Sequence, residues 1–201
     1  MKEALALLAG YLIGSVPFAL VIGKRLYGTD VRQYGSGNLG ATNAGRTLGL
    51  PAFVMVSLLD GAKGFVVYLL VSIFNQRLAL LAGIAVVIGH CYPLFAQFKG
   101  GKGVATSAGL LLAISLRSWS SLLYLFIIPS AIFILIALTT RYISLASMTA
   151  FTTAVIMAWL FADSLDVKLT LTALCLFVIY KHHENIRRLL EHRENRFSFK
   201  K

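Results

Sequence analysis

The chain contains few acidic residues, and their positions exclude several enzyme classes. Only eight of its 201 residues are Asp or Glu, and no acid lies between Asp60 and Asp163. The spaced aspartates with which metal-dependent lipid phosphotransferases hold a divalent cation are therefore missing. No His is followed five residues later by Asp, as the common glycerolipid acyltransferases with a soluble head require, and the G-x-S-x-G nucleophile pattern is absent. These absences leave a mechanism without a metal and without a catalytic triad.

Cysteine is also scarce, and its spacing offers no metal site. Cys91 and Cys175 lie in apolar surroundings far apart in the sequence, with no C-x-x-C pair and no Cys/His ligand spacing. We interpret both as buried packing residues, because free Cys packs as a small hydrophobic side chain. We predict no metal site and no cofactor.

Apolar side chains, by contrast, are abundant. Hydrophobic residues make up 58% of the chain and charged residues 13%, with a mean hydropathy of +0.78, whereas soluble domains are about 25% charged. This composition predicts an all-α integral membrane protein with a single membrane-embedded domain over residues 1–201. Seven apolar stretches predict a bundle of about seven transmembrane helices, at residues 4–26, 50–74, 78–95, 104–116, 119–138, 143–161 and 169–180.

Basic residues give the chain a net charge of +11 and orient the predicted spans. If the N-terminus is outside, 14 of the 19 Lys and Arg residues lie in cytoplasmic segments, and Lys63 lies inside a span. The outer segments then hold Lys2, Arg77, Arg117 and Lys168. The positive-inside rule therefore predicts an outer N-terminus and a cytoplasmic C-terminus. No nucleic-acid motif accompanies the charge, so we expect membrane lipid and no nucleic acid as its partner.

The first of three polar segments, residues 35–46, combines glycines with small polar side chains. Ser36, Asn38 and Asn43 alternate with glycines whose backbone N–H groups can converge on an anion. Arg46 can clamp a phosphate with its planar guanidinium. An ordinary turn-rich loop is the alternative interpretation.

The second segment joins a glycine loop to the start of a predicted helix. Lys99-Gly-Gly-Lys102-Gly103 precedes a span that begins Val-Ala-Thr at 104–106. Free amides, the positive end of the helix dipole and a lysine together form an anion site. The Walker A spacing is absent. His90 precedes this loop at the end of a span, as a packing residue or a substrate contact.

The third segment, residues 181–188, places polar groups on one helical face. His182, Asn185 and Leu189 follow an i, i+3, i+7 spacing, so an imidazole and an amide can reach one substrate. A basic helix that snorkels at the interface is the alternative. We interpret the tail at 191–201 as a solvated end.

Two further polar sites lie at predicted membrane depth or at a span end. Asp60 and Lys63 have i, i+3 spacing within a span and form either a functional or a structural ion pair. Ser144 begins a span, where it adds a donor or permits close helix packing.

These segments resemble a known family. The three long motifs are Ser-Gly-Asn-x-Gly-x-Thr-Asn-x-x-Arg at 36–46, Gly-His-x-x-Pro at 89–93 with Phe-Lys-Gly-Gly-Lys-Gly-Val-Ala-Thr at 98–106, and His-x-x-Asn-Ile-x-Arg-Leu at 182–189. They are similar to motifs of the bacterial acyl-phosphate-dependent glycerol-3-phosphate acyltransferases, the PlsY family. Leu-Asp-x-x-Lys-Gly at 59–64 and Ser-Leu-Ala-Ser at 144–147 fit too. The chain departs from the pattern at Lys181, where Arg is expected, and at His192, where Gly is usual.

The resemblance implies a multi-pass enzyme of the bacterial inner membrane whose active site faces the cytoplasm. It would transfer a fatty acyl group from acyl phosphate to the sn-1 hydroxyl of glycerol 3-phosphate, producing lysophosphatidic acid for phospholipid biosynthesis. Neither acyl-CoA nor acyl carrier protein would serve directly as the donor. We expect a monomer, functionally coupled to an enzyme that produces acyl phosphate.

Residue roles follow from the pattern and the resemblance together. We assign catalysis to Ser36, Arg46, Lys102, His182 and Asn185, and substrate binding to Asn38, Asn43, His90, Gly100, Gly101, Gly103, Thr106 and Ser144. The glycine loop with Lys102 is assigned mainly to the acyl phosphate, and the other catalytic residues mainly to glycerol 3-phosphate, although the two phosphates can be exchanged. The proton acceptor is left open between His182, His90 and a substrate phosphate.

A transporter or channel for a phosphorylated anion is the competing function. It would share the basic loops and the charges within spans. Transport sites lie near the bilayer midplane, whereas the three polar segments here are predicted on one membrane face. The pattern therefore favours an enzyme.

Overall fold

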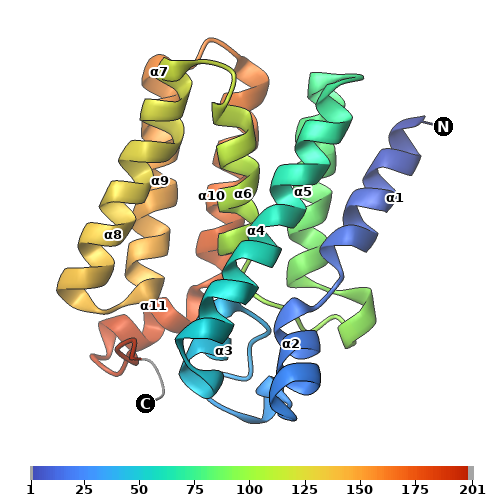
Figure 1. Ribbon diagram of the computed structural model, residues 1–201. Coiled ribbons are helices and arrows are strands. Elements are labelled where there is room, and N and C mark those ends of the chain that lie inside the picture. The colour runs from blue at the N-terminus through green and yellow to red at the C-terminus, as the bar shows by residue number, and fades with distance from the viewer. Residues whose placement is uncertain (1, 199–201) are drawn as a thin grey trace. The chain divides into compact units, whose positions relative to one another are not determined.

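The computed structural model describes residues 2–198, which form helices joined by turns (Figure 1). The chain divides into two compact units, residues 2–113 with Ser198 and residues 114–197. Each unit is described by itself. The predicted all-α class is confirmed, and the single domain over 1–201 stays a prediction.

The first unit contains two long antiparallel helices and a cluster of short elements. The segments are α1 (Lys2–Gly14), α2 (Phe18–Tyr27), the 3₁₀ turn η1 (Val31–Gln33), α3 (Ala41–Leu48), α4 (Leu50–Ser72), α5 (Gln76–Cys91), the 3₁₀ turn η2 (Leu94–Ala96) and α6 (Val104–Ser115), whose last two residues belong to the second unit. α5 packs against both α1 and α4. The short elements α2, α3 and η1 pack near one end of α4 (Figure 1).

The second unit is built around α9. Its segments are α7 (Trp119–Ser121), the π-helical turn η3 (Leu122–Ile127), α8 (Ile128–Thr140), α9 (Ile143–Phe161), α10 (Leu165–Lys181) and α11 (His183–Leu190). α8 and α10 both pack against α9. Capping residues set several helix starts: the side chain of Ser118 accepts from Ser121 N–H and that of Ser164 from Val167 N–H.

Five helical stretches within residues 2–198 are long and apolar enough to cross a membrane. They are Lys2–Tyr27, Leu50–Ser72, Gln76–Ala96, Trp119–Thr140 and Ile143–Phe161, and each overlaps a stretch expected from hydropathy. The stretches expected at 104–116 and 169–180 correspond to α6, which has 12 residues, and α10, which has 17. Seven spans and the orientation of the termini therefore stay predictions.

The first predicted span is broken into two helices. α1 ends at Gly14 and α2 begins at Phe18, because Pro17 lacks an N–H and disfavours a helical conformation in the residue before it. The break leaves backbone carbonyls within an apolar stretch, and such groups require internal partners.

Glycine permits two close helix contacts in the first unit. A Cβ on Gly14 would meet the carbonyl oxygen of Val86 in α5, and a Cβ on Gly109 in α6 would meet that of Gly61 in α4. Larger side chains at either position would push the helices apart, so these glycines fix the interhelical distance.

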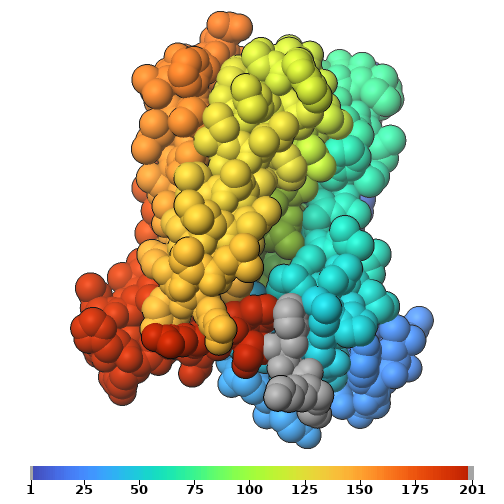
Figure 2. All heavy atoms as spheres, turned by 60° about the vertical axis from the view of Figure 1, so that its left-hand side comes forward, coloured from blue at the N-terminus to red at the C-terminus, as the bar shows by residue number. Residues whose placement is uncertain are grey.

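The second unit presents a long apolar surface along α8. Ile134, Leu135 and Leu138 are exposed by 54–75%, and the helix forms a continuous band in the space-filling view (Figure 2). A surface of this kind is covered by lipid in a membrane protein.

Candidate functional site

The first polar segment is organised by Asn43, which lies in the first turn of α3 and is 1% exposed. Its Oδ1 accepts a hydrogen bond from the Ser36 N–H at 2.9 Å, and its Nδ2 donates to the Val31 carbonyl at 2.8 Å. Gly35 has φ +60°, and a Cβ there would meet Asn43 Oδ1. Asn43 therefore shapes the loop from the inside, while its assignment as a substrate contact stays a prediction.

The other assigned residues of this segment lie nearer the surface. Ser36 is exposed, and Asn38 and Arg46 are partly buried. Arg46 is on the last turn of α3, which begins directly after Gly40. The fold thus presents a hydroxyl, an amide and a guanidinium from one short loop and one short helix.

The second polar segment has unusual backbone geometry before its glycines. Gln97 and Phe98 have left-handed φ values of 56° and 58°, a conformation that costs ordinary residues about 1–2 kcal/mol each. The turn is held by Phe98 N–H donating to the Pro93 carbonyl at 2.9 Å and Lys99 N–H to the Ala96 carbonyl at 3.1 Å. Gly103 also has a left-handed φ of 79°, and α6 begins at the next residue, where the sequence predicted it.

Buried hydroxyls follow the glycine loop. Thr106 and Ser107 are fully buried in the first turn of α6, and their hydroxyl oxygens have no hydrogen-bond partner within residues 2–198. Lys102 is partly buried beside them in the sequence. Burying a hydroxyl without a hydrogen-bond partner destabilises a fold. The first turn of α6 therefore retains two polar groups despite this loss of stability.

One hydrophobic cluster underlies the first two polar segments. It includes Leu39 and Ala44 of the first segment and Ala96 immediately before the second, together with Val31 and Val56. Packing therefore links the two loops inside the first unit, although 50 or more residues separate them in the sequence.

The third polar segment belongs to the second unit and lies where α10 meets α11. His182 is 3% exposed, and its Nδ1 lies 2.7 Å from the Val178 carbonyl. Because a carbonyl can only accept, Nδ1 carries the proton, and Nε2 of the neutral ring is then an acceptor. Asn185, one turn later, is 6% exposed.

A buried carboxylate, Glu194, organises this segment. Its Oε1 accepts from Asn185 Nδ2 at 2.6 Å and from the Ser144 hydroxyl at 2.7 Å, and its Oε2 accepts from Arg188 Nε at 2.8 Å. Burial alone would raise the pKa of the Glu194 carboxyl, but these three hydrogen bonds outweigh it and hold the pKa below its ordinary value. The arrangement joins α9, α11 and the tail through one charged group.

All three polar segments lie within the part of the chain that a protein-family model matches. The glycerol-3-phosphate acyltransferase family model matches residues 4–192. The chain belongs to this family.

Relatives and solved structures agree with the match. The chain is 44% identical over 201 residues to a glycerol-3-phosphate acyltransferase of Bacillus cytotoxicus, covering 98% of this chain and 96% of the relative. It is 43% identical over 192 residues to one of Geobacillus kaustophilus, covering 95% and 94%. The crystal structures of PlsY (YgiH), an integral membrane glycerol 3-phosphate acyltransferase, in glycerol 3-phosphate and lysophosphatidic acid forms are similar with TM-scores of 0.89 and 0.87, at 38% and 37% identity. Each comparison covers 98% of this chain and 96% of the solved chain. The resemblance to the PlsY family is confirmed, and with it a multi-pass membrane protein.

The interpretation of the tail as a solvated end was wrong for Glu194. Its side chain is 4% exposed, and nearby Phe197 N–H donates to the Arg141 carbonyl at 2.7 Å. Hydropathy could not find this residue, because one acid in a polar tail has no periodic pattern. The usual family Gly at His192 was the available signal: His192 has a left-handed φ of 54°, the conformation of a tight turn that brings the tail back. Residues 199–201 lie outside the described part of the chain.

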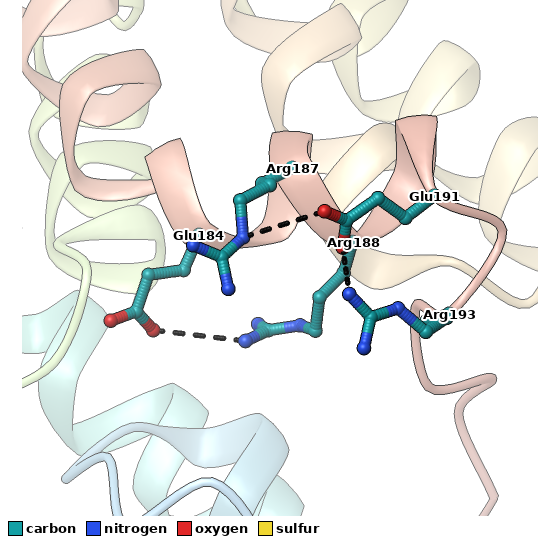
Figure 3. Close-up of a pocket in the computed structure, with 5 residues that line it drawn as sticks. All are labelled: Glu184, Arg187, Arg188, Glu191 and Arg193. Carbon is teal, nitrogen blue, oxygen red and sulfur yellow. Dashed lines mark hydrogen bonds and ion pairs between the residues drawn. The ribbon is translucent and has the colours of Figure 1, made fainter.

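An open pocket in the second unit lies along α11 and includes three residues of the third segment. Five side chains line it, and none of them is an assigned site residue: Glu184, Arg187, Arg188, Glu191 and Arg193 (Figure 3). Two of its ion pairs are long, 3.7 Å for Arg188–Glu184 and 3.8 Å for Arg187–Glu191, and a third joins Arg193 to Glu191 at close range. Exposed pairs of this kind contribute little, so the pocket is a charged surface beside the buried carboxylate.

Proposed function

We propose that the protein transfers a fatty acyl group from acyl phosphate to the sn-1 hydroxyl of glycerol 3-phosphate, producing lysophosphatidic acid and inorganic phosphate. Membership of the glycerol-3-phosphate acyltransferase family supports the acceptor and the class of reaction. The amide-rich loop at 100–103, which leads into the N-terminus of α6, is the observation that carries the choice of a phosphate-bearing donor. This step would commit the acyl chain to phospholipid synthesis.

In this reaction the protein needs mainly to position the two substrates and to stabilise negative charge. The glycerol hydroxyl oxygen attacks the acyl carbon, the bond from that carbon to the phosphate oxygen breaks, and phosphate leaves with the electron pair. Acyl phosphate is a mixed anhydride with a good leaving group, so a covalent enzyme intermediate, a metal and coenzyme A are unnecessary. Proximity and electrostatic stabilisation then supply the rate enhancement.

The residue roles are those assigned from the sequence. Lys102 and the amides of Gly100, Gly101 and Gly103 hold the acyl phosphate, with Thr106 behind them in α6. Ser36, Arg46, His182 and Asn185 hold glycerol 3-phosphate, with Ser144 supporting them and Asn38 and Asn43 shaping the first loop.

His182 is assigned a mainly positioning role. Its Nδ1 donates to the Val178 carbonyl, which fixes the ring and directs Nε2 as an acceptor toward a substrate hydroxyl. The pH–rate profile of His182→Ala distinguishes this from general-base catalysis. An unchanged profile at reduced rate supports positioning, with a substrate phosphate taking the proton. Loss of a limb near neutral pH would identify the imidazole as the base.

The topology is part of the same proposal. Fourteen of 19 basic residues lie on one predicted side, which supports an outer N-terminus and a cytoplasmic active site in the inner membrane. The enzyme would work as a monomer beside an enzyme that supplies acyl phosphate. Labelling of single-cysteine variants, at position 2 and at position 99 in a cysteine-free background, tests this: an impermeant reagent added to intact cells should modify the first and spare the second.

One assay tests the reaction. Purified protein in detergent is given acyl phosphate and labelled glycerol 3-phosphate with a chelator and without coenzyme A, and lysophosphatidic acid is measured. Product formation that acyl-CoA cannot replace supports the proposal. Turnover that requires acyl-CoA or a divalent cation contradicts it.

A further inference from the structure

A buried charged cluster in the first unit joins His90, which the sequence assigned to substrate binding, to two residues with no assigned contact to a substrate. Asp60 and Lys63 of α4 and His90 of α5 are 1%, 4% and 6% exposed. Lys63 Nζ lies 2.8 Å from Asp60 Oδ1, and His90 Nδ1 lies 3.4 Å from the same oxygen. Two ionisable groups, an ammonium group and an imidazole, are therefore gathered around one carboxylate oxygen in an apolar part of the fold.

Lys63 has a structural function in this cluster. Its ammonium group also donates to the Gly14 carbonyl at 3.2 Å and to the Val16 carbonyl at 2.6 Å. The same ammonium group forms the ion pair with Asp60. Lys63 thus satisfies the carbonyls left at the break between α1 and α2. The other neighbour of the Asp60 carboxylate is His90.

His90 contacts the glycine loop with both its backbone and its ring. The Gly101 N–H donates to the His90 carbonyl at 3.2 Å. A Cβ built on Gly101 would meet Nε2 of the His90 ring, with Cε1 at 3.0 Å and Cδ2 at 3.2 Å. A Cβ built on Gly100 would instead meet the His90 carbonyl oxygen. The ring therefore packs against Gly101, and the backbone packs against Gly100.

We propose that Asp60 is a positioning residue for the glycine loop at 100–103 and that it acts through His90. The carboxylate lies 3.4 Å from Nδ1 and electrostatically favours the ring orientation in which Nδ1 faces it, and the opposite edge of the ring limits where Gly101 can lie. Glycine is the most flexible residue, so a loop that must aim several amides at one phosphate needs such a support. The inference rests on the proposed function, in which this loop holds a phosphate.

The cost of burying the cluster supports a role beyond stability. Replacing a buried ion pair with apolar side chains of similar volume is often neutral or stabilising. A simple packing contact between α4 and α5 would not need a carboxylate, and the aromatic ring would not need to be an imidazole.

A double-mutant cycle tests the link between Asp60 and His90. Asp60→Asn and His90→Gln should each raise the KM for one of the two phosphate substrates about tenfold, with a smaller change in kcat, because the loop is displaced but its chemistry is intact. The double variant should be no worse than the poorer single variant. Additive effects, or wild-type KM values in folded Asp60→Asn, would overturn the inference.

Two glycine variants test the contact itself without touching the charges. Gly101→Ala should impair activity in the parent protein and cause no further loss in a His90→Ala background, because removal of the ring makes room for the new Cβ. Gly100→Ala is the matched control: it should impair both backgrounds equally, since the His90 carbonyl remains. Equal damage by Gly101→Ala in both backgrounds, or none in the parent, would overturn the inference.

A second readout separates this inference from the proposed function. If the parent makes no lysophosphatidic acid, the proposed function fails. The loop is then judged by the binding of inorganic phosphate to the same variants in a ³¹P NMR titration. Binding that Gly101→Ala weakens in the parent but not in the His90→Ala background supports the inference. Binding that none of the variants changes overturns it.

Discussion

The two compact units each bury a carboxylate, and they compensate its charge differently. Asp60, within α4, forms an ion pair with an ammonium group that donates to two backbone carbonyls. Glu194, beyond the last helix, accepts hydrogen bonds from α9 and α11, and its one charged donor, Arg188, is 32% exposed in its side chain. The first carboxylate is neutralised inside the apolar part of the fold, whereas the second depends on hydrogen bonds at a solvent boundary.

The difference indicates which carboxylate is more vulnerable. An acid at a solvent boundary can be protonated by bulk water, and its partners can be pulled away by movement of the tail. An acid enclosed with its counter-ion by three helices changes only when those helices change. We therefore expect Glu194 to respond to pH and to nearby substitutions, and Asp60 to act on its immediate neighbours.

The largest expected effect lies in the glycine loop that Asp60 supports. Lys102→Ala should lower kcat/KM about 10²–10³-fold, because it removes the charge that the proposed mechanism assigns to the leaving phosphate, while membrane insertion stays normal. Lys99→Ala is the control, since Lys99 is an exposed lysine three residues away and should change activity less than about twofold. Wild-type turnover of Lys102→Ala would remove the phosphate-binding assignment and leave Asp60 without a functional target.

The next largest effect is expected on stability, at Glu194. Glu194→Ala should lower the free energy of unfolding by about 2–4 kcal/mol, because it leaves an arginine and two buried donors without their acceptor. Glu191→Ala should cost less than about 0.5 kcal/mol, since its side chain is 38% exposed and pairs at the surface. Chemical denaturation in detergent micelles measures both. Equal losses of unfolding free energy in the two variants would mean that the burial of Glu194 gives it no larger contribution to stability than Glu191.

Acid should affect the second unit through Glu194. A carboxyl whose pKa is lowered in the folded state stabilises the protein above its unfolded pKa, and this contribution is lost as pH falls through the folded pKa. Melting temperatures measured from pH 7 downward should therefore fall below about pH 4.5, and Glu194→Gln should flatten the curve. The pKa of Asp30 is also lowered, by a side-chain hydrogen bond from Arg32, so Asp30→Asn is needed as the parallel control. An Asp30→Asn curve that is flat by itself would assign the acid sensitivity to the first unit.

The smallest expected effect concerns the turn that returns the tail to Glu194. His192→Gly should be neutral or stabilise the protein by up to about 1 kcal/mol, because glycine adopts the left-handed conformation of residue 192 without strain. His192→Val should destabilise it by about 1–2 kcal/mol, since a β-branched side chain is disfavoured there. Thermal unfolding of the two variants measures the difference. A stable His192→Val would show that the turn does not constrain Glu194.

Part of the fold and of the site could be predicted from hydropathy and from local sequence motifs. Hydropathy located the five stretches within residues 2–198 that are long and apolar enough to cross a membrane, with α9 found at its observed bounds, and the glycine loop was placed correctly before α6. Pattern could not show that the span at 4–26 would break near Pro17, because Lys63 makes that break tolerable from another helix. It also could not show whether His90 would be a packing residue or a substrate contact, and the approach of its ring to Asp60 depends on how α5 packs against α4.

The sequence by itself determined the membrane class, the family and the three polar segments, because composition, motif order and helical spacing are local properties of the chain. Tertiary structure decided the partners of the buried charges. Asp60 takes His90 from α5, and Glu194 takes Ser144 from 50 residues away. Such pairings form because a buried carboxylate must find donors wherever packing brings them, and packing is a property of the folded chain.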